Sequence, residues 1–295
     1  MAEPKRYSRI FRVRQYECDM YGHVNNANYL RYMQEAAIEA SAAVGYDVAR
    51  YNQMGKLWLP RLTEIEYNQA LKYGDEFEIV TWVEDIRRVR SLRVYEFRRA
   101  GEVAARASTD WVFMDAATRK PESVPPDLMA AYFDDGLPEP AERRAPFPTP
   151  PPPAPRLVIW PHTVNWRDVD MAGHVNNAQY LSLMEDATLE VGRAFGWSLE
   201  RSLSQNLAWV VRRATLEYRT QAHYADALEI TTYLANVRRS SASRFFFVKQ
   251  QGSGELVVQA QLQYVLIDLG SGRPVAIPEE LRRDYADNVS PEATK

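Results

Sequence analysis

The chain has 295 residues, of which 46% are hydrophobic and 25% are charged, a composition typical of a globular protein with about two domains. A formal net charge of −3 argues against a nucleic-acid binder that works through bulk positive charge, and no stretch approaches the roughly 18 consecutive apolar residues of a membrane span. The single cysteine, Cys18, rules out an internal disulfide, and the N-terminus lacks an apolar signal region, so we expect a soluble cytoplasmic protein.

The first half of the chain predicts one long helix followed by an antiparallel meander. An alternating segment over residues 10–16 favours a strand, and a polar motif at 19–30 then opens a helix at about Asn26 or Ala27. Gly45 is expected to end this helix. Residues of β-branched and aromatic type predict further strands near 59–69, 76–87, 91–100 and 102–115. This combination predicts an α+β domain in which the sheet wraps around the helix.

The predicted helix carries an apolar stripe that should face the sheet. The stripe consists of Leu30, Met33, Ala37, Ala40 and Val44. The flank nearest the sheet should be almost wholly buried, which explains its small residues. These are Ala36, Ala37, Ala40, Ala42 and Ala43.

A proline-rich segment then divides the chain. Nine of the 18 prolines lie between Leu137 and Arg156, and such a stretch cannot join the interior of a sheet or helix. We expect an extended spacer that contributes no strand to a core. The sequence therefore predicts an N-terminal domain at residues 1–133, a linker at 134–156 and a C-terminal domain at 157–295.

The second half of the chain repeats the first. Residues 19–30 read Asp-Met-Tyr-Gly-His-Val-Asn-Asn-Ala-Asn-Tyr-Leu, and residues 170–181 read Asp-Met-Ala-Gly-His-Val-Asn-Asn-Ala-Gln-Tyr-Leu, so ten of twelve positions are identical at an offset of 151. The offset persists beyond the motif. It becomes 153 after an expected two-residue hairpin insertion, where Gly101-Glu102 matches Gly254-Glu255.

The predicted elements of the second half follow the same order. A strand over 158–166 leads through the motif into a helix that Gly196 ends. The stripe of this helix is Leu181, Met184, Thr188, Val191 and Phe195. Further strands are predicted near 208–219, 227–238, 243–251 and 255–268. The chain is therefore a tandem duplication of one complete domain.

The duplicated motif combines groups that suit chemistry at a carbonyl. Aspartate is ionised at neutral pH, so Asp19 and Asp170 can act as a nucleophile or as a base for water. Four residues later, His23 and His174 can orient that carboxylate or handle a proton. These four residues are the candidate catalytic groups.

The candidate substrate-binding residues surround the two helix starts. They are Gly22, Asn25, Asn26, Gly173, Asn176 and Asn177. The glycines let a substrate approach the backbone closely, and in each copy either asparagine of the pair can cap the helix. The first-turn N–H groups carry partial positive charge and suit a carbonyl oxygen that becomes negative during reaction.

A structural interpretation of the motif competes with the catalytic one. The loop aspartate can satisfy its own backbone in an Asx-turn, and the histidine can be a buried core residue beside a helix cap. The duplication favours function, because caps interchange among Ser, Thr, Asp and Asn, whereas all five polar or glycine positions are kept in both copies.

The string Asp-x-x-Gly-His-Val-Asn-Asn-Ala-x-Tyr-Leu, placed between a strand and a long helix, resembles the hotdog-fold thioesterases. These include the hydroxybenzoyl-CoA thioesterase-like enzymes and the acyl-acyl carrier protein thioesterases, and the resemblance covers both halves. It implies that Asp19 and Asp170 attack the thioester or activate water. The helix-start N–H groups that polarise the thioester carbonyl would then belong to Asn26 and Asn177.

The resemblance also implies the architecture. The fold would be a tandem double hotdog, each domain an antiparallel sheet wrapped around one long central helix. The two domains would pair as an intrachain pseudo-dimer, which further copies of the chain could join as a homo-oligomer, and the acyl chain would lie between the domains. Plant-type relatives carry an asparagine where this chain has Tyr21 and Ala172, and an acidic residue where it has Gln221.

Three lesser candidates remain. Cys18 corresponds to Val169, which favours a small buried residue over a thiol nucleophile, and the duplicated helix residues Glu39 and Glu190 are either solvated or catalytic acids. A set of arginines could meet the phosphates of coenzyme A or of a carrier protein's prosthetic arm, or could form a charged sheet edge or hairpin. These are Arg87, Arg88, Arg90, Arg93, Arg238, Arg239 and Arg244.

The sequence thus predicts an acyl thioesterase that hydrolyses acyl-CoA or acyl-acyl carrier protein thioesters, with no metal or other cofactor and no nucleic-acid or membrane partner. The alternatives are a hotdog hydratase or dehydratase and a non-catalytic acyl-thioester-binding protein. We expect two competent sites, with the Asp170 site the faster. Ala172 leaves more room there than Tyr21 leaves in the first copy, and Arg167 adds positive charge.

Overall fold

The computed structural model describes residues 3–134, 136–138 and 145–291. The chain divides into two compact units, Met1–Pro146 and Phe147–Lys295. The described parts of the proline-rich segment, 136–138 and 145–156, contain no helix or strand, as expected because proline has no N–H group to donate. Of the predicted linker, residues 135 and 139–144 lie outside the described residues.

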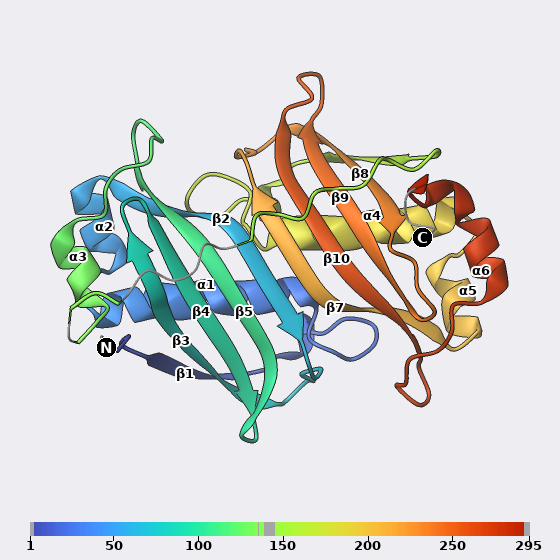
Figure 1. Cartoon of the computed structure of the whole chain (residues 1–295), viewed down its shortest axis with the longest axis horizontal. Helices are drawn as coiled ribbons and strands as arrows, with labels where there is room; N and C mark the ends of the chain where they lie inside the picture. The colour runs from blue at the N-terminus through green and yellow to red at the C-terminus, as the bar shows by residue number, and fades with distance from the viewer. Residues whose placement is uncertain (1–2, 135, 139–144, 292–295) are drawn as a thin grey trace. The chain divides into compact units, whose positions relative to one another are not determined.

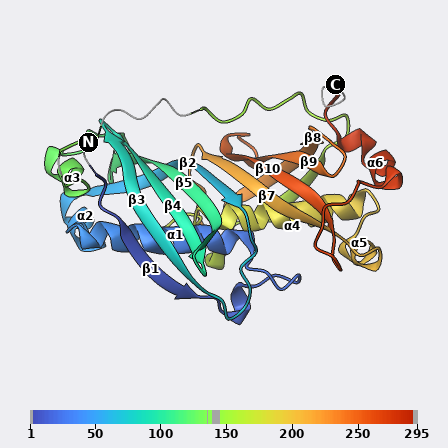
Figure 2. The ribbon, with the colours of Figure 1, turned by 60° about the horizontal axis from the view of Figure 1, so that its bottom comes forward.

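In the first unit, five antiparallel strands pair in the order β1-β3-β4-β5-β2. The strands are β1 (Tyr7–Arg12), β2 (Lys56–Tyr67), β3 (Glu76–Arg87), β4 (Arg90–Arg99) and β5 (Glu102–Asp115). The long helix α1 (Asn26–Ala43) lies along one face of this sheet (Figure 1, Figure 2). The shorter elements are η1 (Gln15–Glu17), α2 (Val48–Met54) and α3 (Pro126–Ala131).

The second unit repeats this plan, with its strands paired in the order β6-β8-β9-β10-β7. The strands are β6 (Val158–Thr163), β7 (Leu207–Tyr218), β8 (Ala227–Ala235), β9 (Ser241–Gln250) and β10 (Leu256–Asp268). The long helix is α4 (Gln179–Ala194), and the shorter elements are η2 (Trp166–Asp168), α5 (Leu199–Ser204), α6 (Glu279–Asp284) and η3 (Ala286–Asn288). The prediction of an α+β tandem double hotdog is confirmed.

Each long helix buries its predicted stripe against the sheet of its own unit. Leu30, Met33 and Ala40 are buried in the first unit, and their counterparts in α4 are buried as well. The prediction of a buried flank is wrong for Ala42 and Ala43, which are exposed. Ala42 lies about 200° around the helix from Ala40, and Ala43 is the final residue of α1.

Both long helices end where the glycines predict. Gly45 and Gly196 follow the last helical turns with φ of +86° and +76°, in the left-handed region that glycine enters without steric cost. Within the ranges that the structure describes, no helix has both the length and the apolar character needed to cross a membrane.

The first strand of each unit ends earlier than predicted. The alternation suggested a strand over 10–16, but β1 begins at Tyr7 and ends at Arg12, and β6 ends at Thr163 rather than near Trp166. In each case the chain leaves the sheet for a 3-10 turn that a carboxylate caps, so the alternating pattern continues into residues that do not pair. The short helices α2, α3, α5 and α6 were not predicted.

Candidate functional site

The first motif forms a small loop closed around Asp19, directly after η1. The main-chain N–H of Asp19 donates to the carbonyl oxygen of His23 at 2.8 Å. In return, the Asp19 Oδ1 atom accepts the N–H groups of Tyr21 at 2.9 Å and His23 at 3.1 Å. The aspartate therefore makes the Asx-turn that the structural interpretation expects, while its side chain stays half-buried rather than enclosed.

In the second motif, the carboxylate of Asp170 is tied to the start of the helix. Its Oδ1 atom accepts the N–H of Ala172 at 2.9 Å, and its Oδ2 atom accepts the side-chain amide of Asn176 at 3.0 Å. The main-chain N–H of Asp170 donates to His174 at 3.1 Å, as in the first copy. Both carboxylate oxygens thus have a fixed direction, and the side chain is again half-buried.

The first asparagine of each pair accepts an N–H two residues ahead, but only Asn25 caps its helix. Asn25 accepts the N–H of Ala27 at 3.0 Å as the N-cap of α1. Its counterpart Asn176 accepts the N–H of Ala178 at 2.9 Å. The helix α4 begins at Gln179, with Ala178 as its N-cap and no side-chain cap, so the expectation that Asn176 or Asn177 caps this helix is wrong.

The second asparagine of each pair is held through its carbonyl oxygen. The hydroxyl of Tyr67 donates to Asn26 at 3.5 Å, and the hydroxyl of Tyr218 donates to Asn177 at 3.2 Å. Both tyrosines stand at the end of the strand after the long helix, β2 or β7. These bonds fix the peptide groups at the helix start, where the predicted carbonyl-polarising N–H groups lie.

A buried carboxylate lies two residues before each motif aspartate. Glu17 is 8% exposed and accepts the N–H of Arg14 at 2.6 Å, and Asp168 is 2% exposed and accepts the N–H of Asn165 at 2.7 Å. The carbonyl oxygens of the same two residues accept the N–H groups of the capping asparagines, each at 2.9 Å. Each buried acid therefore joins both ends of its motif loop.

The two copies satisfy these buried carboxylates differently. In the first, the hydroxyl of Tyr32 donates to Glu17 at 2.6 Å, and this bond together with burial raises the pKa of Tyr32. In the second, His162 Nε2 lies 2.9 Å from Asp168 Oδ2, and the amide of Gln179 donates to Asp168 Oδ1 at 3.0 Å. The sequence placed a carboxylate near each candidate acid but did not indicate that it is a buried support for the loop.

The motif glycines are required by the backbone. Gly22 and Gly173 have φ of +76° and +81°, which strains any residue with a Cβ atom. A Cβ built on either glycine would meet nothing within 4 Å. The glycines are therefore explained by loop conformation, and open space beside them leaves room for a substrate atom.

The histidines join the site mainly through their main chains. The main-chain carbonyl oxygen of each histidine accepts the N–H of its motif aspartate, and the N–H of His23 also donates to Asp19 Oδ1. The His174 ring is buried, and its Nδ1 atom lies 3.4 Å from the carbonyl oxygen of Val175, whereas His23 is half-buried. The structure thus brings aspartate, glycine, histidine and both asparagines into one loop in each unit.

Gln221 has a feature that the sequence did not predict. The Nε2 atom of this side chain is buried and makes no hydrogen bond within the described residues. The next residue, Ala222, accepts the main-chain N–H of Val175 at 2.8 Å, so the segment that carries Gln221 lies against the second motif. An unused buried donor beside a candidate site is costly for stability and is typical of functional positions.

The structure gives no support for a catalytic role of Cys18, Glu39 or Glu190. Cys18 is half-buried, and burial raises the pKa of its thiol, which disfavours a thiolate nucleophile. Glu39 accepts the Tyr7 hydroxyl at 3.0 Å and pairs with Arg9, and Glu190 pairs with Arg193 one helical turn away. These partners fit the interpretation that both glutamates are structural.

The arginine set was predicted to form a charged sheet edge or a hairpin, and its exposed members lie at the β3–β4 and β8–β9 hairpins. They are Arg88, Arg90, Arg238 and Arg239. Arg93 and Arg244 are 5% and 4% exposed and lie on β4 and β9, which have strand neighbours on both sides. Arg87 donates to Asp85 and to the carbonyl oxygen of Pro138, each at 2.7 Å. The expectation of an exposed edge is wrong for the two buried arginines, since strand order is a tertiary property that periodicity does not reveal.

Comparison with protein families identifies the repeated unit. The model of the thioesterase-like superfamily matches residues 13–132 and again 164–284. The chain belongs to the thioesterase-like superfamily. Both matches contain a complete motif loop, so the two thioesterase-like domains correspond to the two units of the structure.

Curated relatives and solved structures fit this membership. The chain is 24% identical over 288 residues to the chloroplastic acyl-[acyl-carrier-protein] hydrolase FATB2 of Cuphea viscosissima, covering 94% of this chain and 66% of the relative. It is 32% identical over 124 residues to the long-chain acyl-CoA thioesterase FadM of Escherichia coli, covering 41% of this chain and 91% of the relative. The crystal structure of an acyl-ACP thioesterase from Bacteroides thetaiotaomicron superposes with a TM-score of 0.70 at 20% identity, covering 88% of this chain and 97% of that one.

Proposed function

We propose that this thioester hydrolase cleaves the acyl thioester of a phosphopantetheine arm, carried by coenzyme A or by an acyl carrier protein. The relative that matches along nearly the whole chain is named for acyl carrier protein substrates, and the relative that matches one domain is named for acyl-CoA. Both substrates present the same thioester group, so one site can serve either.

The observation that carries the proposal is the link between a carboxylate and a helix start in the second motif. Asn176 donates to Asp170 through its Nδ2 atom and accepts the N–H of Ala178 through its Oδ1 atom. A negatively charged group and the N-terminal turn preceding α4 are therefore held at a fixed separation. The carboxylate supplies a nucleophile or base, and the helix-start N–H groups stabilise a developing oxyanion.

The reaction can follow two routes through this arrangement. If Asp170 attacks, the acyl group forms a mixed anhydride with the carboxylate, the thiolate leaves, and water then hydrolyses the anhydride. If Asp170 acts as a base, it takes a proton from a water molecule that attacks the thioester directly. His174 and the buried amide of Gln221 stand in the same loop region and would orient the water or the carbonyl oxygen.

The second site has the more open surroundings. Tyr21 is half-buried in the first loop, where burial raises the pKa of its hydroxyl, while its counterpart Ala172 is small and exposed. Arg167 is also exposed beside the second motif and can attract a phosphate-bearing substrate. We therefore propose that both sites turn over and that the Asp170 site is the faster.

A substrate screen tests the proposed activity. Thiol release would be followed over a series of acyl-CoA esters and matched acyl-acyl carrier protein esters, with the double variant Asp19→Asn, Asp170→Asn as the control. We expect release by the wild type to fall by at least a factor of about 10² in the double variant. Substrate binding without thiol release would instead identify an acyl-thioester-binding protein, and hydration of an enoyl thioester would identify a hydratase.

The two chemical routes can be separated by isotope labelling. A single turnover in H₂¹⁸O places ¹⁸O in the Asp170 carboxylate only if that carboxylate has attacked the substrate. Mass spectrometry of the peptide that contains Asp170 measures the label. An unlabelled peptide together with a labelled acid product fits base catalysis and equally fits water attack on the acyl carbon of the anhydride. Borohydride, which reduces an acylated aspartate to homoserine, separates these two cases when the mass of the same peptide is measured.

A further inference from the structure

A cavity of about 440 Å³ lies in the second unit, and none of its lining residues belongs to the second motif. Its walls come from the second half of α4, from β7 to β10, and from α6 and the residues after it, and most of the lining is apolar. This volume is within the range of pockets that hold small organic ligands. Thr188 lines it about 13 Å along α4 from the first helical residue, Gln179.

One buried cation lines this cavity. Arg244 is 4% exposed on the interior strand β9, and burial lowers the pKa of its guanidinium. Its Nη1 atom donates to Asn288 at 3.4 Å, and its guanidinium lies 5.9 Å from the ring centre of Tyr285. Across the described ranges, no carboxylate forms an ion pair with Arg244. A buried guanidinium without a counter-ion is unfavourable, so the arrangement favours an anionic ligand.

A second polar group of the cavity also lacks a partner. Ser290 is 1% exposed, and its Oγ atom makes no hydrogen bond in the part of the chain that the structure describes. Its main-chain N–H is used, because it donates to Leu234 at 2.8 Å. The cavity wall, which also includes the half-buried Arg282, therefore adds the buried guanidinium of Arg244 and the unpartnered hydroxyl of Ser290 to a largely apolar surface.

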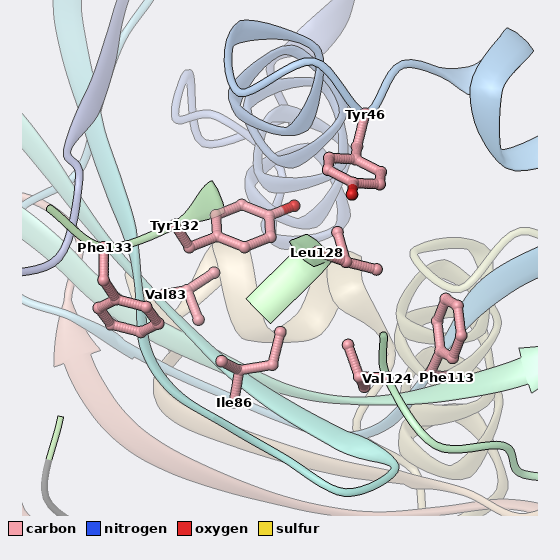
Figure 3. Close-up of a cluster of buried hydrophobic side chains, with 8 residues drawn as sticks. All are labelled: Tyr46, Val83, Ile86, Phe113, Val124, Leu128, Tyr132 and Phe133. Atoms are coloured by element: carbon pink, nitrogen blue, oxygen red, sulfur yellow. The ribbon is translucent and has the colours of Figure 1, made fainter. Parts of the chain in front are cut away.

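The first unit carries an aromatic side chain at the corresponding position of its sequence. Phe133 is 3% exposed there and packs in a cluster with Val83, Ile86 and Tyr132 (Figure 3). At the offset of 153, Phe133 corresponds to Ala286, which lines the cavity and is exposed at its edge.

Other features of the two places agree. Arg93 lies 5.4 Å from the ring of Tyr132, just as its counterpart Arg244 lies 5.9 Å from the ring of Tyr285. The buried arginine and its tyrosine are thus common to both units, while the aromatic side chain of Phe133 is replaced by a methyl group.

We propose that this cavity binds the carboxylate end of an apolar chain, with Arg244 as the ion-pair partner and Ser290 as a second donor. Guanidinium matches the planar geometry of a carboxylate with two parallel hydrogen bonds. Arg282, the other arginine of the lining, already donates to main-chain carbonyl oxygens, so Arg244 is the guanidinium left for a singly charged head, and the apolar walls suit the aliphatic remainder. The carboxylate can belong to a free fatty acid or to the far end of an acyl chain whose other end is a thioester.

Isothermal titration calorimetry of the full chain with octanoate tests the proposal, with octan-1-ol as the uncharged control. We expect octanoate to bind the wild type with one site per chain. Arg244→Met should weaken octanoate by at least about tenfold and leave octan-1-ol unchanged, because only the carboxylate uses the guanidinium. Equal affinity for the two ligands, or an unchanged octanoate affinity in this variant, would overturn the proposal.

Ala286→Phe provides a matched variant that keeps Arg244. It installs the residue that the first copy carries, and we expect it to remove octanoate binding while thioester hydrolysis at the motif loops continues. Because binding is read by calorimetry, failure of the proposed hydrolysis would not affect this result. Retained octanoate binding in Ala286→Phe, with a native circular dichroism spectrum, would place the ligand elsewhere and contradict the proposal.

Two further measurements distinguish the sources of the carboxylate. Preference for an ω-carboxyacyl-CoA over the plain acyl-CoA of equal length, lost in Arg244→Met, assigns the cavity to the far end of the substrate. Free octanoate binding without such a preference assigns it to a free acid.

A control variant tests whether the chain occupies the cavity with a carboxylate of its own. Glu292 lies beyond the described residues, so Glu292→Gln is included. Octanoate binding seen only in this variant would show that the chain supplies its own carboxylate, and would overturn the proposal.

Discussion

The substitution Asp168→Asn should weaken the second unit and slow its site together. The Asp168 carboxylate is 2% exposed and accepts hydrogen bonds from the Asn165 N–H at 2.7 Å, from His162 at 2.9 Å and from Gln179 at 3.0 Å. An asparagine has one acceptor oxygen, so at least one of these donors would face an amide NH₂ group. A hydrogen bond to a charged group contributes about 1.5–3 kcal/mol, and we expect a loss of that size in the free energy of unfolding.

Asp168→Asn should also lower the rate of hydrolysis, because the main chain of Asp168 positions the motif loop. The carbonyl oxygen of Asp168 accepts the N–H of Asn176, which in turn holds the Asp170 carboxylate. A shift of this loop by a fraction of an ångström should lower kcat by about tenfold or more, with KM nearly unchanged, because the reacting groups are misplaced rather than removed.

Urea unfolding followed by tryptophan fluorescence measures the stability, and thiol release measures kcat and KM. Glu17→Gln is the matched control in the first unit, and it should lower stability while leaving most of the turnover intact if the Asp170 site is the faster. An unchanged urea midpoint and an unchanged kcat in Asp168→Asn would refute the view that this buried acid supports the site.

Three further outcomes are expected. Asn176→Ala removes both the bond to Asp170 and the bond from the Ala178 N–H, so it should cost about 1 kcal/mol of stability by urea unfolding and lower kcat about tenfold. Gly173→Ala forces a Cβ into a φ of +81° and should cost about 1–2 kcal/mol, seen as a lower Tm with no change in the partners of the loop. The Tyr46 hydroxyl donates to Asp127 at 2.7 Å and holds the pKa of that carboxyl below its usual value, so this bond stabilises the fold above about pH 4 and is lost as the pH falls. Tyr46→Phe should therefore raise the pKa of Asp127 in an NMR titration and weaken the loss of stability in acid.

The repeat and the alternation of residues were enough to predict most of the fold. Strands β3 and β5 have the bounds that the pattern indicated, and the two glycines end the long helices where predicted. The first strands were overextended because a carboxylate three residues ahead caps a 3-10 turn at Arg14 and at Asn165. The acids, Glu17 and Asp168, lie just past the predicted segments, so their spacing is a usable signal that periodicity alone does not include.

The sequence predicted which residues form the candidate site but not the hydrogen bonds that they make. All the motif residues lie in one loop per unit, since they are close in sequence and share a helix start. The roles of Arg244 and Gln221 were not predictable in this way. The burial of Arg244 depends on what packs against its face of the sheet, and Gln221 has an unused donor in a segment that folds back against the motif.

The central claim is that the two motif aspartates carry out the chemistry. Steady-state hydrolysis by Asp19→Asn, Asp170→Asn and the double variant, on the best acyl thioester of the screen, tests it most directly. We expect Asp170→Asn to remove most of the turnover, Asp19→Asn to remove a smaller share, and the double variant to lose at least a factor of about 10² while it still binds substrate. Turnover in the double variant close to that of the wild type, with unchanged KM, would contradict the account.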